Sequence, residues 1–151
     1  MLSNPSGNVT VTVVAVEAVV SPTIINILDT VGYTDNMRFS ATNGAEKTDN
    51  GCVATGYIPM SDIDWDDTYY AWGAEFNNDN ASGKCVAVAY DTNKTVISQG
   101  YMDDGTNYCG NLKLHVDENG VLQIRRNGES RPAYFRFSGV GSGANVVVTK
   151  N

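Results

Sequence analysis

The sequence predicts an all-β domain, either a sandwich or a barrel, with very little helix. Three observations support this class. Apolar and polar residues alternate in about ten short runs, as they do along strands that bury one face. Clusters of Gly, Asn, Asp and Ser separate the runs, and such clusters favour turns. No segment combines helix caps with a sustained apolar period of 3.6 residues.

The N-terminal segment is predicted to be a long strand. Residues 8–20 alternate and are rich in Val and Thr, and the run ends at Ser21 and Pro22. This strand either joins the domain's sheet or ends a preceding domain. We therefore divide the chain into residues 1–22, a strand and linker that form a candidate attachment arm, and residues 23–151, one β-sandwich domain. A chain of 151 residues is long enough to bury a core of its own.

The middle of the chain is predicted to contain short strands and polar loops. Two pairs of strands are expected to form hairpins, because residues 91–94 and residues 117–120 (Asp-Glu-Asn-Gly) are tight-turn sequences. A proline at position 59 places its strand at an edge or ends it. Strands are expected at 37–41, 52–60, 68–76, 85–90, 95–99, 111–116 and 121–125, and loops at 42–51, 61–67, 77–83 and 100–110.

The C-terminal stretch is predicted to be a closing hairpin, with strands at 132–138 and 145–149 joined by a glycine-rich connection. Strand alternation places Phe135 and Phe137 in the core and Arg136 on the opposite face. The Gly-X-Gly spacing in the connection does not indicate a phosphate site, because that motif must open a helix and a β-branched run follows here.

Composition disfavours several classes of partner. The formal net charge is −7, which leaves no broad cationic surface for nucleic acid or anionic lipid. The longest apolar run, residues 13–20, contains Glu17 and is too short to span a bilayer, so no membrane insertion is expected. The three cysteines have no metal-binding spacing. One pair could form a disulfide, but three free buried thiols are favoured.

Catalysis is not expected. His115 is the only histidine, and no nucleophile motif accompanies it. The acidic loop at 61–67 supplies several carboxylates from one element, whereas a glycosidase usually draws its pair from separate elements. Asp62, Asp64 and Asp66 in this loop are candidate Ca²⁺ ligands, although a solvated acidic turn is the alternative.

Four residues are candidate ligand contacts. Arg38 and Arg136 each lie on the non-core side of a strand beside aromatic residues, and a guanidinium can bind sugar hydroxyls or a carboxylate. Tyr57 and Tyr134 are candidates for stacking on sugar rings. For the arginines, an ordinary salt bridge to an acidic residue is the alternative. If Arg136 contacts a ligand, its replacement by Ala should weaken binding without changing thermal stability.

Four stretches of the chain have a recognisable pattern when taken together: residues 32–40, 55–59, 86–91 and 133–145. They resemble a jelly-roll module that recurs in tail, baseplate and head-fibre proteins of phages of gut bacteria, and the resemblance covers about residues 24–150. Residues 7–12 are similar to the last strand of the Ig-like domain that often precedes this module. The resemblance implies a jelly-roll β-sandwich of about 8–10 antiparallel strands with minimal helix.

The resemblance also implies a function. The expected function is non-enzymatic: a domain on the phage particle that recognises a bacterial cell-surface glycan during host adhesion. One alternative is a structural decoration or fibre protein that binds other virion proteins, through strand pairing or as a homo-oligomer. Another is a carbohydrate-binding module cut from a bacterial enzyme. The expected location is the virion surface, or otherwise the extracellular bacterial surface.

Overall fold

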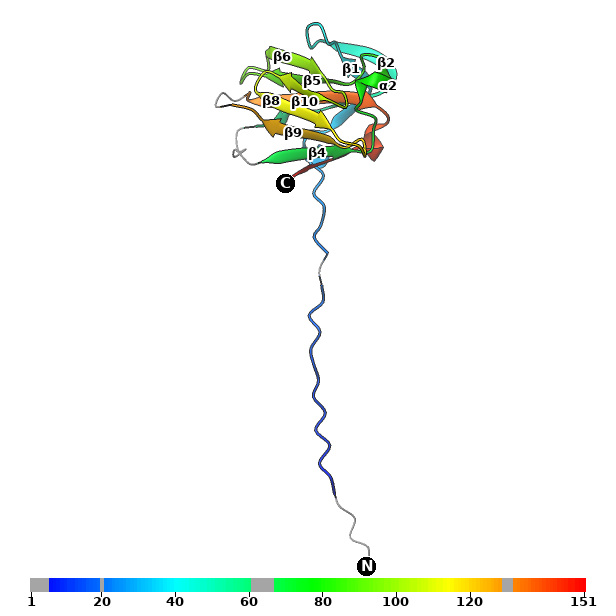
Figure 1. Ribbon diagram of the computed structural model, residues 1–151, viewed down its shortest axis with the longest axis vertical. Helices are drawn as coiled ribbons and strands as arrows, with labels where there is room; N and C mark the ends of the chain where they lie inside the picture. The colour runs from blue at the N-terminus through cyan, green and yellow to red at the C-terminus, as the bar shows by residue number, and fades with distance from the viewer. Residues whose placement is uncertain (1–5, 20, 61–66, 129–131) are drawn as a thin grey trace, which may run out of the picture.

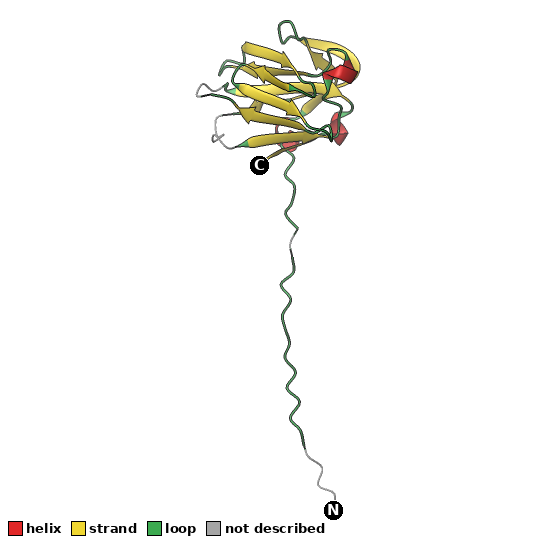
Figure 2. Cartoon of the chain, viewed as in Figure 1, coloured by secondary structure: helices red, strands yellow, loops and turns green. Residues whose placement is uncertain are grey.

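The computed structural model describes residues 6–19, 21–60, 67–128 and 132–151. Two antiparallel sheets pack face to face as a sandwich, and strands make up 45% of the described residues against 8% helix. The predicted all-β sandwich is therefore confirmed, and its arrangement is compatible with a jelly-roll-like fold. Figure 2 shows how little helix the sandwich contains.

One sheet, here called sheet A, has its described strands in the order β1-β2-β10-β5-β6, and β3 also pairs with β10. Every pair in it is antiparallel. The bounds are β1 Tyr33–Phe39, β2 Glu46–Thr55, β3 Ile58–Pro59, β5 Val86–Tyr90, β6 Val96–Tyr101 and β10 Tyr134–Val140.

The other sheet, here called sheet B, has its described strands in the order β11-β4-β9-β8-β7, again antiparallel throughout. Figure 1 shows β4, β9 and β8 side by side in this layer. The bounds are β4 Thr68–Trp72, β7 Thr106–Cys109, β8 Leu112–Val116, β9 Leu122–Arg126 and β11 Val147–Lys150. The helices are α1 Leu28–Val31, α2 Asn78–Ala81 and the 3₁₀ turn η1 Gly143–Asn145.

The predicted closing hairpin is wrong, because β10 and β11 lie in different sheets. β10 pairs with β2, β3 and β5, whereas β11 pairs with β4. The glycine-rich connection therefore crosses from one layer of the sandwich to the other. At Gly143 an added Cβ would lie 2.0 Å from the ring of Tyr33, so a larger residue fits only if this exposed ring moves. A turn-rich connection and two alternating strands are equally typical of a hairpin and of a crossover, and this ambiguity explains the error.

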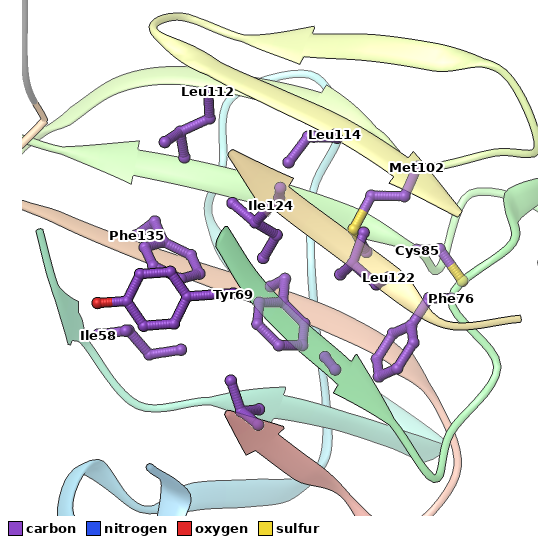
Figure 3. Packing of buried hydrophobic residues seen from close by; sticks show 14 of the residues in the cluster. Ile58, Tyr69, Phe76, Cys85, Met102, Leu112, Leu114, Leu122, Ile124 and Phe135 are labelled. Carbon is purple, nitrogen blue, oxygen red and sulfur yellow. The ribbon is translucent and has the colours of Figure 1, made fainter. Parts of the chain in front are cut away.

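The core fills the space between the sheets. Phe135 and Phe137 on β10 are buried there, as predicted, and they pack edge-on against Tyr69 and Phe76 with ring centroids 5.2 and 5.5 Å apart. Leu122 and Ile124 of β9 cover the same region from sheet B (Figure 3). Strand alternation sends the intervening side chains to the outer faces of the two sheets.

The outer face of sheet A carries a second buried cluster, covered by the hairpin of β1 and β2. Phe39, Ala54, Val86, Val88 and Tyr90 form it. Along β1 the register jumps from a pair with Val53 to a pair with Thr48, so the longer β2 strand bulges and the end of the hairpin bends over the sheet. The sequence predicted a loop at 42–51, where the structure instead has the first half of β2. The polar residues there lack strand-like alternation.

Another strand was also missed. β7 lies within the segment predicted as a loop at 100–110, because Thr-Asn-Tyr-Cys is polar and short. Its register with β8 pairs Thr106 with His115 and Tyr108 with Lys113. β7 forms one edge of sheet B and therefore widens the outer face of that sheet.

Residues 6–19 extend away from the sandwich (Figures 1 and 2). Residues 6–19 have no strand assignment, and their valines are 76–93% exposed. The predicted strand at 8–20 therefore has no sheet partner within the described residues. Among those residues, no helix has the length and apolar character needed to cross a membrane.

The chain joins the sandwich at Asn26. The Asn26 side chain accepts a hydrogen bond from the Val148 N–H at 3.0 Å and donates one to the Val146 carbonyl at 3.0 Å. The Ile27 N–H donates to the Val148 carbonyl at 2.8 Å. Strand β11 is therefore held between this entry segment on one side and β4 on the other.

Candidate functional site

The outer face of sheet B is the open broad face of the sandwich. Its inward residues, such as Leu114 and Ile124, are buried, while alternation turns their neighbours outward. Those outward side chains are half-buried or exposed rather than covered by another part of the described chain. They are Thr68, Tyr70 and Trp72 on β4, Thr106 and Tyr108 on β7, Lys113 and His115 on β8, Gln123 and Arg125 on β9, and Val147 and Thr149 on β11.

Strand register arranges these side chains in two rows. In one row, Tyr70 is opposite Thr149 on one side and Gln123 on the other, and Gln123 is opposite His115, which is opposite Thr106. The second row contains, in order, Thr68, Arg125, Lys113 and Tyr108. With strands about 4.8 Å apart, the longer row runs about 19 Å across the sheet.

The two rows enclose a shallow hollow of about 320 Å³. Its lining contains hydroxyl, amide, imidazole and cationic groups together with one aromatic ring. The lining residues are Thr68, Tyr70, Thr106, Lys113, His115, Gln123 and Arg125. The arrangement can offer hydrogen bonds and a ring face to a polar ligand.

Positive charge gathers in this hollow. Lys113 and Arg125 are direct cross-strand neighbours, in a chain with 10 Lys and Arg against 17 Asp and Glu. His115 lies two residues from Lys113 on the same strand, and its Nδ1 is 3.2 Å from the Gly105 carbonyl. A carbonyl oxygen can only accept, so Nδ1 carries a proton in this contact.

The structure brings together three of the four predicted ligand contacts, on the outer face of sheet A. The Arg136 guanidinium lies 4.6 Å from the Tyr57 ring, and the Tyr57 and Tyr134 ring centroids are 5.9 Å apart. Lys94 Nζ lies 4.6 Å from the Tyr57 ring. Burial raises the pKa of neighbouring Tyr90 to about 12, although Arg136 opposes the shift.

Arg136 itself is buried, with 5% of its surface exposed. Its Nη1 donates to Glu46 Oε1 at 2.6 Å, and its Nε donates to the Thr55 carbonyl at 2.8 Å. Arg136 is on the face opposite Phe135 and Phe137, as alternation predicted, but the β1–β2 hairpin covers that face. Its guanidinium therefore ties the hairpin to the sheet.

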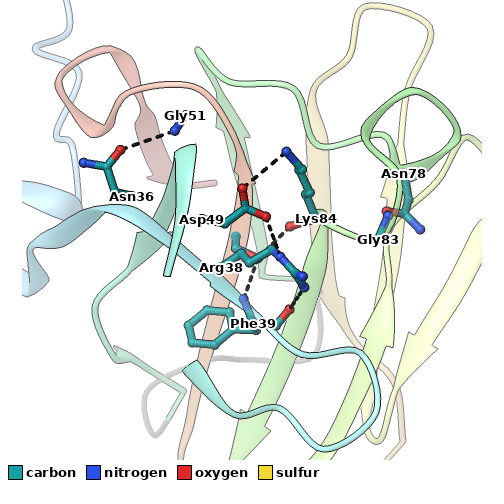
Figure 4. A network of polar contacts seen from close by, with 9 residues as sticks. Asn36, Arg38, Phe39, Asp49, Gly51, Asn78, Gly83 and Lys84 are labelled. Carbon is teal, nitrogen blue, oxygen red and sulfur yellow. Dashed lines mark hydrogen bonds and ion pairs between the residues drawn. The ribbon is translucent and has the colours of Figure 1, made fainter. Parts of the chain in front are cut away.

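Arg38 lies apart from these residues, in a polar network shown in Figure 4. Its Nε donates to Asp49 Oδ2 at 2.7 Å, and Lys84 Nζ lies 3.4 Å from the other carboxylate oxygen. The hydrogen bond from Arg38 is the main reason that the pKa of Asp49 is lowered. The network links the bulge in β2 to Lys84, two residues before β5.

The candidate calcium ligands Asp62, Asp64 and Asp66 lie outside the described residues. Within the described ranges, no group of three or more His, Cys, Asp or Glu side chains is arranged to hold a metal ion.

The three cysteines are free and buried, as favoured by the sequence. Burial raises the pKa of Cys85 to about 12 and that of Cys109 to about 11. Their thiols therefore remain protonated near neutral pH and act as small core residues.

Sequence reasoning overlooked the hollow in sheet B, although a signal for it was present. In residues 112–116 (Leu-Lys-Leu-His-Val) and 122–125 (Leu-Gln-Ile-Arg), apolar and polar residues alternate on both sides of a strong turn sequence. Pairing these two strands about the turn would have placed Lys113 beside Arg125 and His115 beside Gln123. What the pattern could not reveal is which outer face of the sandwich stays open.

The chain matches no protein-family model, no curated protein and no solved structure.

Proposed function

We propose that the protein is a non-enzymatic carbohydrate-recognition domain and that the outer face of sheet B binds the glycan. The observation that carries this proposal is the contrast between the two broad faces. The protein's own hairpin covers the outer face of sheet A, while sheet B presents an open strip of hydroxyl, amide, aromatic and cationic groups around a hollow.

The chemistry of the strip fits sugar rings. Sugars present many hydroxyls along their edges, which side chains such as Gln123 and Thr106 can pair with as donors and acceptors. Tyr70 and Tyr108 offer ring faces to the apolar face of a sugar, and Tyr108 is 55% exposed. A strip about 19 Å long accommodates several linked sugars rather than one.

Recognition without cleavage is supported by the lining of the hollow. Its described lining residues include neither Asp nor Glu, whereas glycoside hydrolysis uses a pair of carboxyl groups. The resemblance to phage jelly-roll modules supports a place on a virion surface, where the glycan would belong to the bacterial envelope.

The test is a screen of the intact protein against bacterial and plant glycans, followed by titration calorimetry with the best ligand. Tyr70→Ala and Tyr108→Ala should each weaken binding about tenfold, since each loses a stacking contact. Tyr101→Ala is the matched control, because Tyr101 is 46% exposed but lies on β6 of sheet A. Failure of the intact protein to bind any glycan would contradict the proposal, as would equal losses in all three variants.

A second candidate function is structural, and the exposed N-terminal arm favours it. Val9, Val11 and Val13 alternate with threonines and asparagine and are 78–86% exposed. An alternating β-branched segment without a partner is suited to adding a strand to the sheet edge of another virion protein. The arm and the open face of sheet B are separate surfaces, so attachment and glycan binding are compatible.

A further inference from the structure

We propose that the ligand of the sheet B face is an acidic glycan, whose carboxylate or sulfate group binds between Lys113 and Arg125. This inference rests on the proposed function and narrows its substrate class. It depends on three observations: the register of β8 and β9, the place of both cations in the hollow, and the acidic character of the rest of the protein.

Register brings the two cations together. Lys113 is directly opposite Arg125, and Cβ atoms of such pairs are about 5 Å apart. An anionic group placed between them is attracted by both cations, so the pair is better suited to a charged ligand than to a neutral one.

The chemical groups around the pair suit an anion carried on a sugar. An arginine guanidinium can form two parallel hydrogen bonds with a carboxylate or sulfate, and a lysine ammonium adds a mobile point charge. His115 lies two residues after Lys113 on β8, in the row that also contains Gln123 and Tyr70. Gln123 can pair with hydroxyls of the same sugar, and Tyr70 can pack against its ring. Arg125 also takes part in another interaction within the chain, so Lys113 is the first contact expected for the anion.

The negative net charge of the chain limits which kind of polyanion can bind to it. With a formal net charge of −7, the protein repels a long, densely charged polymer such as nucleic acid at a distance. The hollow contains two permanent cations, and one of them, Arg125, already takes part in another interaction, so the hollow suits one charged group at a time. This favours a glycan with spaced acidic sugars.

The experiment compares ligands that differ only in charge. Partly methyl-esterified polygalacturonate, which carries spaced carboxylates, is paired with its fully methyl-esterified form, and dextran with few sulfate groups is paired with unmodified dextran. Binding is measured by titration calorimetry, with duplex DNA as a separate arm. The expected result is binding to an acidic polymer that exceeds binding to its neutral counterpart by about tenfold or more. Binding should also weaken as NaCl rises, because the screening length falls from about 10 Å at 0.1 M to about 3 Å at 1 M.

Two variants test whether the acidic polymer binds at Lys113. Lys113→Gln should weaken binding to the acidic polymer about tenfold, since a hydrogen bond to a charged group is lost. Lys47→Gln changes the net charge equally, but Lys47 is exposed on β2 of sheet A, and this variant should bind like the wild type. Thermal melting of both variants verifies their folding.

The outcomes separate the two proposals. Equal binding of acidic and neutral polymers, with Lys113→Gln unaffected, overturns the acidic-glycan inference and leaves glycan recognition standing. Equal losses in Lys113→Gln and Lys47→Gln overturn the assigned site, because they show an effect of net charge alone. DNA binding as tight as that of the acidic glycan also overturns the inference. Binding to none of the glycans contradicts the proposed function itself.

Discussion

Arg136 shows how the surroundings of one residue decide its role. Alternation along β10 correctly places it opposite two core phenylalanines, and this position suggested an exposed ligand contact. The structure instead covers it with the β1–β2 hairpin, where its guanidinium bonds to Glu46 and to the Thr55 carbonyl and lies 4.7 Å from the Phe39 ring. Its role in this structure is to fasten the hairpin.

Arg136→Ala is therefore expected to destabilise the fold, by about 2 kcal/mol, because a charge-assisted hydrogen bond to a buried carbonyl is lost. The measurement is urea unfolding followed by tryptophan fluorescence. Glu46→Gln should have a smaller effect, since the Glu46 side chain is 54% exposed and its charge is partly screened by water. An Arg136→Ala protein as stable as the wild type, but with impaired glycan binding, would instead support the prediction that Arg136 contacts a ligand.

At the scale of elements, close backbone approaches hold short segments against the sheets. Gly56, between β2 and β3, donates its N–H to the Gly32 carbonyl at 2.8 Å. A Cβ added to Gly56 would lie 1.9 Å from the Val31 carbonyl oxygen at the end of α1. The Gly56 backbone and the Val31 carbonyl both belong to the main chain, so neither can rotate away as a side chain can.

Gly56→Ala should accordingly cost about 3 kcal/mol, because relieving the overlap requires a shift of α1 or of the β2–β3 connection. Gly7→Ala is the control, since no atom lies within 4 Å of the position its Cβ would occupy. Thermal melting of the two variants side by side tests this. If Gly56→Ala has the same melting temperature as the wild type, α1 is not held as closely to the β2–β3 connection as the structure shows.

The elements that could be predicted from sequence were those with both alternation and a strong turn. The hairpin of β8 and β9 was predicted to within a residue at each end, because apolar positions alternate on both sides of an Asn-Gly turn. β7 and the first half of β2 were missed because their polar residues gain strand structure only by pairing with neighbours. The crossover before β11 was mistaken for a hairpin because no local sequence pattern indicates which sheet a strand joins.

The candidate site was harder to predict than the fold for a related reason. Lys113, His115, Gln123 and Arg125 have polar, outward positions that the sequence shows, but so does Arg136. The sheet B residues stay accessible while Arg136 is buried, because the bent β1–β2 hairpin covers the outer face of sheet A and leaves that of sheet B open. Such a bend depends on long-range packing, which no local pattern reports.

At the scale of the whole molecule, the described arm and the sandwich are separable. Residues 6–19 are exposed and unpaired, so they contribute little to the stability of the sandwich. Removing residues 1–20 should leave the thermal midpoint of the sandwich and its glycan binding unchanged. If the arm is the attachment segment, the same truncation should abolish incorporation into particles, measured by co-sedimentation with virions. Full incorporation of the truncated protein would exclude attachment through the arm.

The junction at Asn26 has a mechanical consequence. If the arm is anchored, a pulling force on it is transmitted to the sandwich through the hydrogen bonds of Asn26 and Ile27. The partners in these bonds are Val146, just before β11, and Val148, within β11. The load would therefore reach β11 at the edge of sheet B before it reached the hairpin of β8 and β9. Under tension, β11 should peel from β4 first, while the cations of the hollow keep their register.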